Sequence, residues 1–247
     1  MTLHKPNPRT GNTAEFKRRL LEKSLAMHAQ AYLAQIKAKL LTQMIMQIEN
    51  SKKNLQILNE TLASEIIARK QVEEHIQYMA SHDDLTGLPN RALFRDILEM
   101  AQSMSLRQQS KLAVLFIDLD GFKAVNDNFG HKIGDLLLQT VAKLLESSVR
   151  QSDSVARIGG DEFIILLNSL NEEADAAIVA HKILAALQPP ILLDGHAAKV
   201  GASIGISIFP DHSRDTEKLI AYADGAMYKI KKSGKNAYAF HATAESA

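Results

Sequence analysis

Two groups of acidic residues in the second half of the sequence have the types and spacing of a site for hard cations and phosphates. Asp118 and Asp120 end an apolar run, and Asp161 and Glu162 follow a pair of glycines. Acids that leave a buried strand lie at the end of a sheet, where divalent cations and phosphates are commonly bound. Paired glycines allow positive φ and a close approach of a ligand. Each group alone also fits an ordinary turn, but their convergence predicts a carboxylate site for metal-assisted phosphoryl transfer.

Alternating strand and helix patterns surround these acids. The run KLAVLFID at 111–118 predicts a strand buried on both faces. Strands at 154–158 and 162–167, joined by two glycines and an acid, predict a hairpin. The other expected elements are helices at 91–106, 132–148, 172–187 and 215–232, a strand pair at 191–193 and 197–209, and a final strand at 236–240. This order predicts an α/β (α+β) sandwich of the ferredoxin-like type, with helices packed on a mainly antiparallel sheet.

The N-terminal third has a different pattern. Residues 13–80 contain no Pro and no Gly, a composition that favours continuous helix. From Leu41 to Met79, mostly apolar residues alternate spacings of three and four, which predicts a parallel coiled-coil dimer. An amphipathic helix lying on its own domain is the alternative, and an extra step between Leu40 and Met44 fits either a stutter or a break between two helices. We expect a helical stalk for dimerisation and regulation at 1–80 and a second domain at 81–247.

Composition excludes several classes of protein. The 247 residues include no Cys, which excludes disulfides, a thiol nucleophile and a thiolate metal site. No apolar run is long enough for a membrane span, and the polar N-terminus lacks the apolar core of a signal peptide, so we expect a cytoplasmic protein. Net charge is +5 over 1–80 and −4 over 81–247. Because the basic residues are mixed with acids and few aromatic residues accompany them, we expect no DNA binding.

The sequence resembles a known family in several ordered motifs. ARIGGDEF at 156–163 contains the GGDEF signature, and DDLTGLPNR, DLDGFKAVNDNFGHKIGD and ADGAMY occur at 83–91, 118–135 and 223–228. On these motifs, residues 81 to about 240 resemble the diguanylate cyclases. The resemblance implies a fold related to polymerase palms and class III nucleotide cyclases. It also implies condensation of two GTP into 3′,5′-linked cyclic di-GMP with release of two pyrophosphates, in bacterial second-messenger and biofilm signalling.

The resemblance assigns the catalytic and metal-binding residues. Mg²⁺, with Mn²⁺ as an alternative, is expected on the carboxylates of Asp118 and Asp161 and on the carbonyl of Leu119, which are hard oxygen ligands. Asp161 is also the family's presumed base for the ribose 3′-hydroxyl, and Glu162 belongs to the same acidic turn. A carboxylate of ordinary pKa is a poor base for an alcohol, so most of the activation is expected to come from the metal.

The resemblance also assigns the substrate-binding residues. Asn126 and Asp135 are expected to read the guanine edge, and His131 either contacts the substrate or supports the turn before it. The phosphates are expected to bind the backbone amides around Gly121 and the positively charged side chains of nearby lysines. The residues assigned to the phosphates are Phe122, Lys123, Lys231 and Lys235.

Two departures from the family pattern occur at the phosphate residues. Lys235 stands where the family usually has Arg, and Ile230 where it usually has Ala. Lysine keeps the charge but loses the forked hydrogen-bond geometry, so we expect weaker triphosphate binding rather than inactivity. Ile158 replaces a commoner aromatic residue, and we attach no consequence to it.

An inhibitory product site and a regulatory partner are also expected. Arg150 and Asp153 match the RxxD motif at which cyclic di-GMP inhibits members of the family, although a cation at a helix C-terminus is favourable in any case. No PAS, GAF or receiver-like module is recognisable before 81, so a separate regulatory protein is expected to bind the stalk and set the geometry of the homodimer.

Two competing functions stay open. A degenerate GGDEF domain would act as a GTP or cyclic di-GMP binding module, and an interaction protein would use only its coiled coil. Because this chain keeps Asp118, Asp161 and Glu162, we favour an active cyclase.

Overall fold

The computed structural model describes residues 9–242, with side chains at Thr13 and from Glu15 onward. It divides the chain into two units that meet between Val72 and Glu73. Residues 1–8, which include much of the polar N-terminus considered above, and residues 243–247 lie outside the described residues. No helix within 9–242 has the length and apolarity that crossing a bilayer requires.

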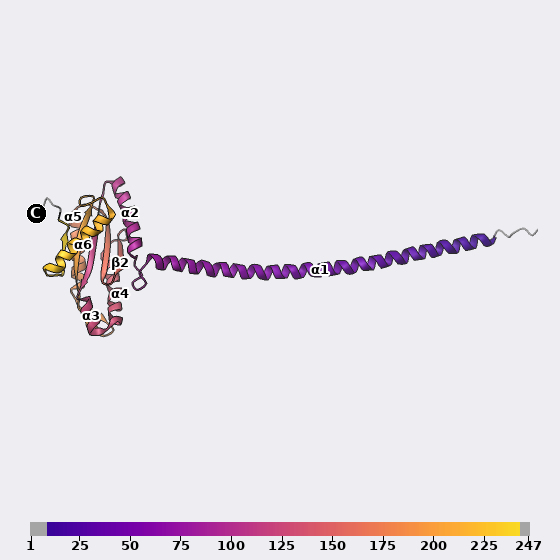
Figure 1. Cartoon of the computed structure of the whole chain (residues 1–247), viewed down its shortest axis with the longest axis horizontal. Coiled ribbons are helices and arrows are strands. Elements are labelled where there is room, and N and C mark those ends of the chain that lie inside the picture. Colours follow the sequence, from indigo (N-terminus) through magenta and orange to yellow (C-terminus); the bar gives the residue numbers. More distant parts are fainter. Residues whose placement is uncertain (1–8, 243–247) are drawn as a thin grey trace, which may run out of the picture. The chain divides into compact units, whose positions relative to one another are not determined.

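Helix α1 (Arg9–Ser81) is a single continuous helix, which resolves the choice between a continuous and a broken stalk (Figure 1). The absence of Pro and Gly after its first turn explains this continuity. All described side chains from Glu15 to Ala80 are exposed, including Leu41, Leu55 and Leu62 of the heptad pattern. The helix therefore carries a long stripe of apolar side chains that no other described residue of the chain covers.

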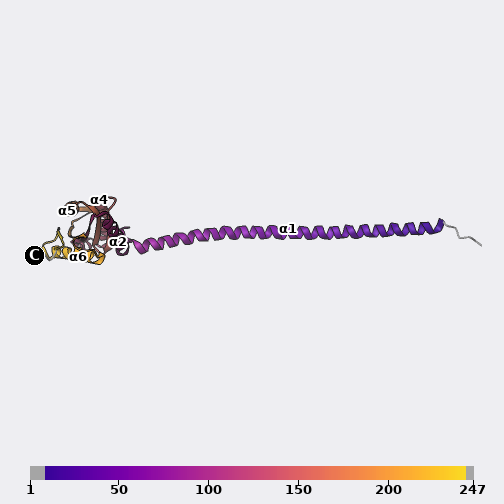
Figure 2. The ribbon, with the colours of Figure 1, turned by 90° about the horizontal axis from the view of Figure 1, so that it is seen from above.

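The second unit is a five-stranded sheet with helices on both faces, as predicted (Figures 1 and 2). Its helices are α2 (Arg91–Gln108), α3 (Phe122–Phe129), α4 (His131–Ser148), α5 (Glu173–Leu187) and α6 (Thr216–Ser233). Its strands are β1 (Lys111–Asp120), β2 (Ser154–Gly159), β3 (Glu162–Leu170), β6 (Gly201–Phe209) and β7 (Ala237–Phe240), with a small hairpin of β4 (Ile191–Leu193) and β5 (His196–Ala198). The strand order is β2-β3-β1-β6-β7, and only the β6–β7 pair is parallel.

Strand β1 lies at the centre of the sheet and is buried on both faces, as its apolar run predicts. Leu115 and Ile117 pack with residues of α4 and α5 on one face. Val114 and Phe116 pack with residues of α2 and α6 on the other. The strand extends to Asp120, two residues beyond the expected end, so both of its acids belong to the sheet.

Two elements differ from the sequence prediction. No helix is expected from the sequence between 118 and 132, yet 122–129 form α3, because Gly121 takes a positive φ of 89° and Val125 is buried in the core. The expected strand 197–209 is two strands: β5 pairs with β4, and β6 joins the main sheet between β1 and β7. Residues 191–193 therefore pair only with the beginning of the expected strand, at 196–198, and not with β6.

Helix α6 touches the backbone of β6 at Gly205. A Cβ atom at this position would lie 1.9 Å from the carbonyl oxygen of Ala223 and 2.3 Å from the amide nitrogen of Met227. Both neighbours are backbone atoms of the helix, so they cannot turn aside as a flexible side chain would. Glycine is therefore required here for the close packing of α6 on the sheet.

We predict that Gly205→Ala strongly lowers the melting temperature, because the methyl group must push α6 away from the sheet. Gly225→Ala, in the same helix, is the matched control, since a Cβ there meets nothing within 4 Å. The control should be neutral or stabilising by about 1 kcal/mol, the usual difference between Ala and Gly within a helix. Thermal unfolding followed by circular dichroism compares the two, and equal melting temperatures would contradict the packing described here.

Candidate active site

The two acidic groups predicted from the sequence lie side by side in the sheet. Asp118 on β1 is directly opposite Glu162 on β3. The amide of Leu119 donates a hydrogen bond of 3.2 Å to the carbonyl oxygen of Asp161, in the turn between β2 and β3. The ladder of β1 and β3 thus places both acids of the turn beside the end of the central strand.

Asp118 is a buried carboxylate with one cationic partner. Its side chain is 4% exposed, and its Oδ2 accepts a hydrogen bond of 2.5 Å from Nζ of Lys231 on α6. Its Oδ1 is buried and has no hydrogen-bond partner. Burial raises the pKa of Asp118 more than the hydrogen bond from Lys231 lowers it, and the charge of Asp161 raises it further. Lys231 therefore offsets only part of the cost of burying the negative charge of Asp118.

Asp120 has a different role from Asp118, although the two are only two residues apart. Its carboxylate accepts hydrogen bonds of 3.0 Å from the hydroxyl of Ser203 on β6 and of 2.9 Å from the amide of Asn236, just before β7. Both oxygens are therefore used inside the fold. Asp120 joins three strands, and Asp118 is left as the acid that is free to bind a ligand.

Glu162 extends the negative field of the site. Its pKa is raised by burial and then by the charges of Asp118, Asp224 and Asp161, while Lys231 opposes these effects. Lys231 itself shows the complementary response: burial would lower its pKa, but the hydrogen bond and charge of Asp118 raise it overall. Several carboxylates thus share one lysine, which is an arrangement that attracts a further cation.

The donors present suit a hard divalent cation. The unpartnered Oδ1 of Asp118, a carboxylate at Asp161 and the carbonyl of Leu119 are all oxygen ligands of the kind that Mg²⁺ prefers. Within the described residues, no three side chains of His, Asp or Glu gather as a self-sufficient chelating group.

Arg157 holds the acidic turn in place, a role that the sequence reasoning missed. Its Nε and Nη2 donate hydrogen bonds of 3.0 and 2.7 Å to the carbonyl oxygen of Gly160. Its Nη1 binds both oxygens of Asp83 at 2.8 and 3.0 Å, and the amide and hydroxyl of Thr86 also donate to Asp83. Burial would raise the pKa of Asp83, but these hydrogen bonds together lower it. Arg157 and Asp83 each lie in one of the motifs shared with the family, and this was the only sign of their role in the sequence.

The residues expected to read guanine lie on α3 and α4. Asn126 of α3 packs against α4 at Gly134, where a Cβ atom would lie 1.9 Å from the Asn126 Oδ1. Asp135 is the next residue of α4 and is exposed, as is His131 at the start of that helix. The fold therefore brings Asn126 close to the turn of α4 that carries Asp135.

The expected phosphate residues lie on two sides of β1. Phe122 and Lys123 begin α3, where the first backbone amides of a helix are available to an anion. Phe122 is partly buried against the core and Lys123 is exposed. Lys231 contacts Asp118, whereas Lys235 lies in the turn after α6 with a positive φ of 64° and is exposed. Lys231 is thus the residue of this group that the structure joins directly to the acids.

The expected inhibitory site lies at the other end of β2 from the acidic turn. Arg150 and Asp153 line a cavity of about 240 Å³ together with residues of α5. The Asp153 carboxylate accepts hydrogen bonds of 3.0 Å from the amides of Arg150 and Asn168. Asp153 thus shapes the turn, while the Arg150 side chain is exposed.

We predict that Glu162→Gln raises the melting temperature of the metal-free protein at pH 7. A raised carboxyl pKa means that the folded state disfavours the ionised form, so Glu162 costs stability once the pH is above its ordinary pKa of 4.5. The difference between the variant and the wild type should shrink towards pH 4, where the side chain becomes protonated in both states. Melting curves with a chelator across this pH range test it; a lower melting temperature of the variant at pH 7 would contradict the charge balance described.

Comparison with known proteins agrees with this geometry. The family described as "Diguanylate cyclase, GGDEF domain" matches residues 80–237. The bifunctional diguanylate cyclase/cyclic di-GMP phosphodiesterase MucR of Pseudomonas aeruginosa is 46% identical over 162 residues, which are 66% of this chain but only 24% of MucR. This chain thus spans about a quarter of that relative's length.

Solved structures show the same likeness. The isolated GGDEF domain of TpbB from P. aeruginosa is 42% identical, with a TM-score of 0.64 over 65% of this chain and 94% of that one. The diguanylate cyclase SiaD of P. aeruginosa, solved in complex with its activator SiaC, is 25% identical, with a TM-score of 0.60 over 95% of this chain and 91% of that one. With the acidic turn, the central strand and the shared motifs in one domain, the chain belongs to the GGDEF family of diguanylate cyclases.

Proposed function

We propose that this chain condenses two molecules of GTP into cyclic di-GMP and releases two pyrophosphates. The observation that carries the proposal is the buried Asp118, which lies opposite Glu162, has one oxygen without a hydrogen-bond partner and shares a single lysine with the neighbouring carboxylates. A hard-cation site of this kind beside the turn is what metal-assisted phosphoryl transfer requires.

The reaction consists of two equivalent displacements. In each, the 3′-hydroxyl oxygen of one GTP bonds to the α-phosphorus of the other, the bond from that phosphorus to the bridging oxygen breaks, and pyrophosphate leaves. The hydroxyl proton passes to a carboxylate of the turn. Asp161 is the base that the family resemblance suggests. Glu162 is a second candidate, because its raised pKa makes Glu162 a better proton acceptor than an ordinary carboxylate.

Asp118, Asp161 and the carbonyl of Leu119 would hold Mg²⁺, or Mn²⁺ in its place. The bound ion would neutralise phosphate charge and stabilise the leaving pyrophosphate. Lys231 lies where it can contact the same phosphates once the acid it now pairs with has another cation. Phe122 and Lys123 at the start of α3, with Lys235, would bind the rest of the triphosphate.

Guanine selectivity is assigned to α3 and α4. Asn126 offers an amide and Asp135 an exposed carboxylate, which can accept from the ring N–H and the amino group of guanine. Adenine lacks this pair of donors on one edge, so a site built for guanine rejects it. His131, exposed at the start of α4, is a further candidate for contact with the base or sugar.

Catalysis requires two protomers, because one active site supplies only half of the ring. We propose that the exposed heptad stripe of α1 forms a parallel homodimer, which raises the local concentration of the second half-site. SiaD resembles this chain over nearly its whole length and was solved in complex with its activator, which supports a separate regulatory protein for this chain. We propose that such a protein binds the stalk. A cytoplasmic location fits a substrate and product of this kind.

The purified full chain with GTP and Mg²⁺ should yield cyclic di-GMP, detected by chromatography, and none after the metal is chelated. Asp161→Asn should lower turnover at least about 100-fold without lowering the melting temperature, because it removes one carboxylate from an accessible turn. Asp194→Asn, the same change in the exposed turn between β4 and β5, is the control and should behave like the wild type. Binding of GTP without any product would instead favour the binding-module alternative.

We also expect cyclic di-GMP to inhibit the enzyme through Arg150 and Asp153. The exposed Arg150 can make forked hydrogen bonds to a phosphate or guanine edge beside the cavity that it lines. Arg150→Ala should leave the initial rate of product-free enzyme unchanged and reduce its inhibition by added product at least about tenfold. Arg214→Ala, at another exposed arginine, is the control. Equal inhibition of wild type and Arg150→Ala would refute the site.

A further inference from the structure

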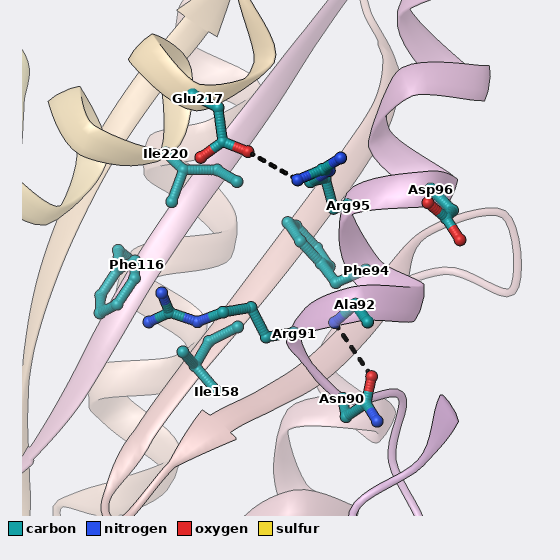
Figure 3. Close-up of a pocket in the computed structure, with 10 residues that line it drawn as sticks. All are labelled: Asn90, Arg91, Ala92, Phe94, Arg95, Asp96, Phe116, Ile158, Glu217 and Ile220. Carbon is teal, nitrogen blue, oxygen red and sulfur yellow. Dashed lines mark hydrogen bonds and ion pairs between the residues drawn. The ribbon is translucent and has the colours of Figure 1, made fainter. Parts of the chain in front are cut away.

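A groove of about 750 Å³ lies between α2 and α6, above the sheet (Figure 3). Phe116 of β1 and Ile158 of β2 form its floor, and Phe94 and Ile220 line it from the two helices. Charged side chains stand around this apolar floor, two of them arginines of α2. The sequence motifs and the site described above give this groove no role.

The groove adjoins the acidic site on the same face of the sheet. Phe116 is two residues before Asp118 on β1, so both side chains point to that face, at a spacing of about 7 Å. Ile158 precedes Gly159, which is paired with Glu162 on β3. A ligand lying in the groove therefore reaches the carboxylates without crossing the sheet.

The two arginines of the groove differ in their pairing. Arg95 makes ion pairs of 3.5 Å with Glu217 of α6 and with Glu99 of its own helix. The guanidinium of Arg91 has no hydrogen bond or ion pair with any described residue, and it extends over the floor beside Phe116 and Ile158 (Figure 3). The groove thus offers an unpaired cation above an aromatic and aliphatic surface, a combination that suits an anion carrying a flat or apolar group.

We propose that this groove binds the second nucleotide of the reaction, with Arg91 on the α-phosphate of the GTP carried by the partner protomer. The proposal rests on the function proposed above. The first GTP is expected to place its guanine on α3 and α4, whose core-facing residues pack on the opposite face of the sheet, and its phosphates near Lys231. The groove lies on the opposite face of the sheet from that guanine and on the same face as Asp118, so it is open to a second nucleotide that reaches the same acids.

The chemistry of the displacement gives Arg91 a specific task. Negative charge at the α-phosphate is carried by its two non-bridging oxygens, and a guanidinium can bind both with parallel hydrogen bonds. The apolar floor excludes water below the sugar, which strengthens this interaction. Because the contact is to the reacting phosphate of the partner's nucleotide, Arg91 affects turnover more than the binding of each protomer's own GTP.

Kinetics of full-length variants provide the first test. Arg91→Ala should lower kcat about 100-fold, the usual effect of losing one donor to a reacting group, while the Kd for a GTP analogue with a methylene group between the α- and β-phosphorus atoms changes less than about twofold. Arg91→Lys should recover part of the rate, because it keeps the charge without the fork. Arg107→Ala, at an exposed arginine of α2 that does not line the groove, is the matched control and should retain wild-type kcat. Wild-type turnover of Arg91→Ala, or a weaker Kd at unchanged kcat, would overturn the proposal.

Arginine footprinting provides a readout that does not depend on turnover. Phenylglyoxal modification, located by peptide mass spectrometry, should be slowed at Arg91 by the same analogue with Mg²⁺, and not at Arg107, which lies outside the groove. Slowing should disappear in the full chain with Leu55→Glu and Leu62→Glu, which places charges in the heptad stripe and separates the protomers. Protection of Arg91 in that monomer would assign it to the protomer's own nucleotide and refute the proposal. A wild type that shows protection but makes no product would refute the proposed function alone.

Discussion

A carboxylate loses most of its solvation when it is taken out of water, and Asp118 is almost completely buried on the central strand. Its only charged hydrogen-bond partner among the described residues is Lys231, and one of its oxygens remains unpaired. A buried charge with such limited compensation is a cost to the fold. Neighbouring elements surround this residue: β3 brings further acids to it, α6 brings the lysine, and Asp120 bonds to β6 and to the residue before β7.

The start of the domain and the acidic turn are connected by one side chain. Arg157 binds the carbonyl of Gly160 on one side and Asp83 on the other, so the segment that follows α1 is bonded directly to the turn. Asp83 is in turn held by Thr86. A change in the position of residues 83–86 therefore acts on the backbone of the GGDEF turn through two hydrogen-bonded steps. This gives the sequence motif at 83–91 a structural role that its residue types alone did not reveal.

Much of the fold could be predicted from the sequence because its strongest signals are local. The apolar run of β1, the glycine turn at Gly159 and the long segment without Pro or Gly each determine their own element. Helix α3 escaped prediction because it is short and rich in Asn and Asp; only the αL turn at Gly121 and the burial of Val125 make it helical. The role of Asp120 depends on Ser203 and Asn236, which are distant in sequence, and the pairing of Arg157 with Asp83 is equally non-local. No local pattern contains such partners.

The backbone contact at Gly205 fixes the position of α6 relative to the acidic site. Ala223, Met227 and Lys231 are spaced by four residues along one side of α6, and the first two touch β6 at Gly205. Gly205 and Ser203 are paired with Phe116 and Asp118 of β1, so one helical turn along α6 corresponds to two residues along the strands. The reach from Lys231 to Asp118 is therefore set by main-chain atoms. Substitution of core side chains around α6 would therefore leave Lys231 within reach of Asp118 as long as this backbone contact holds.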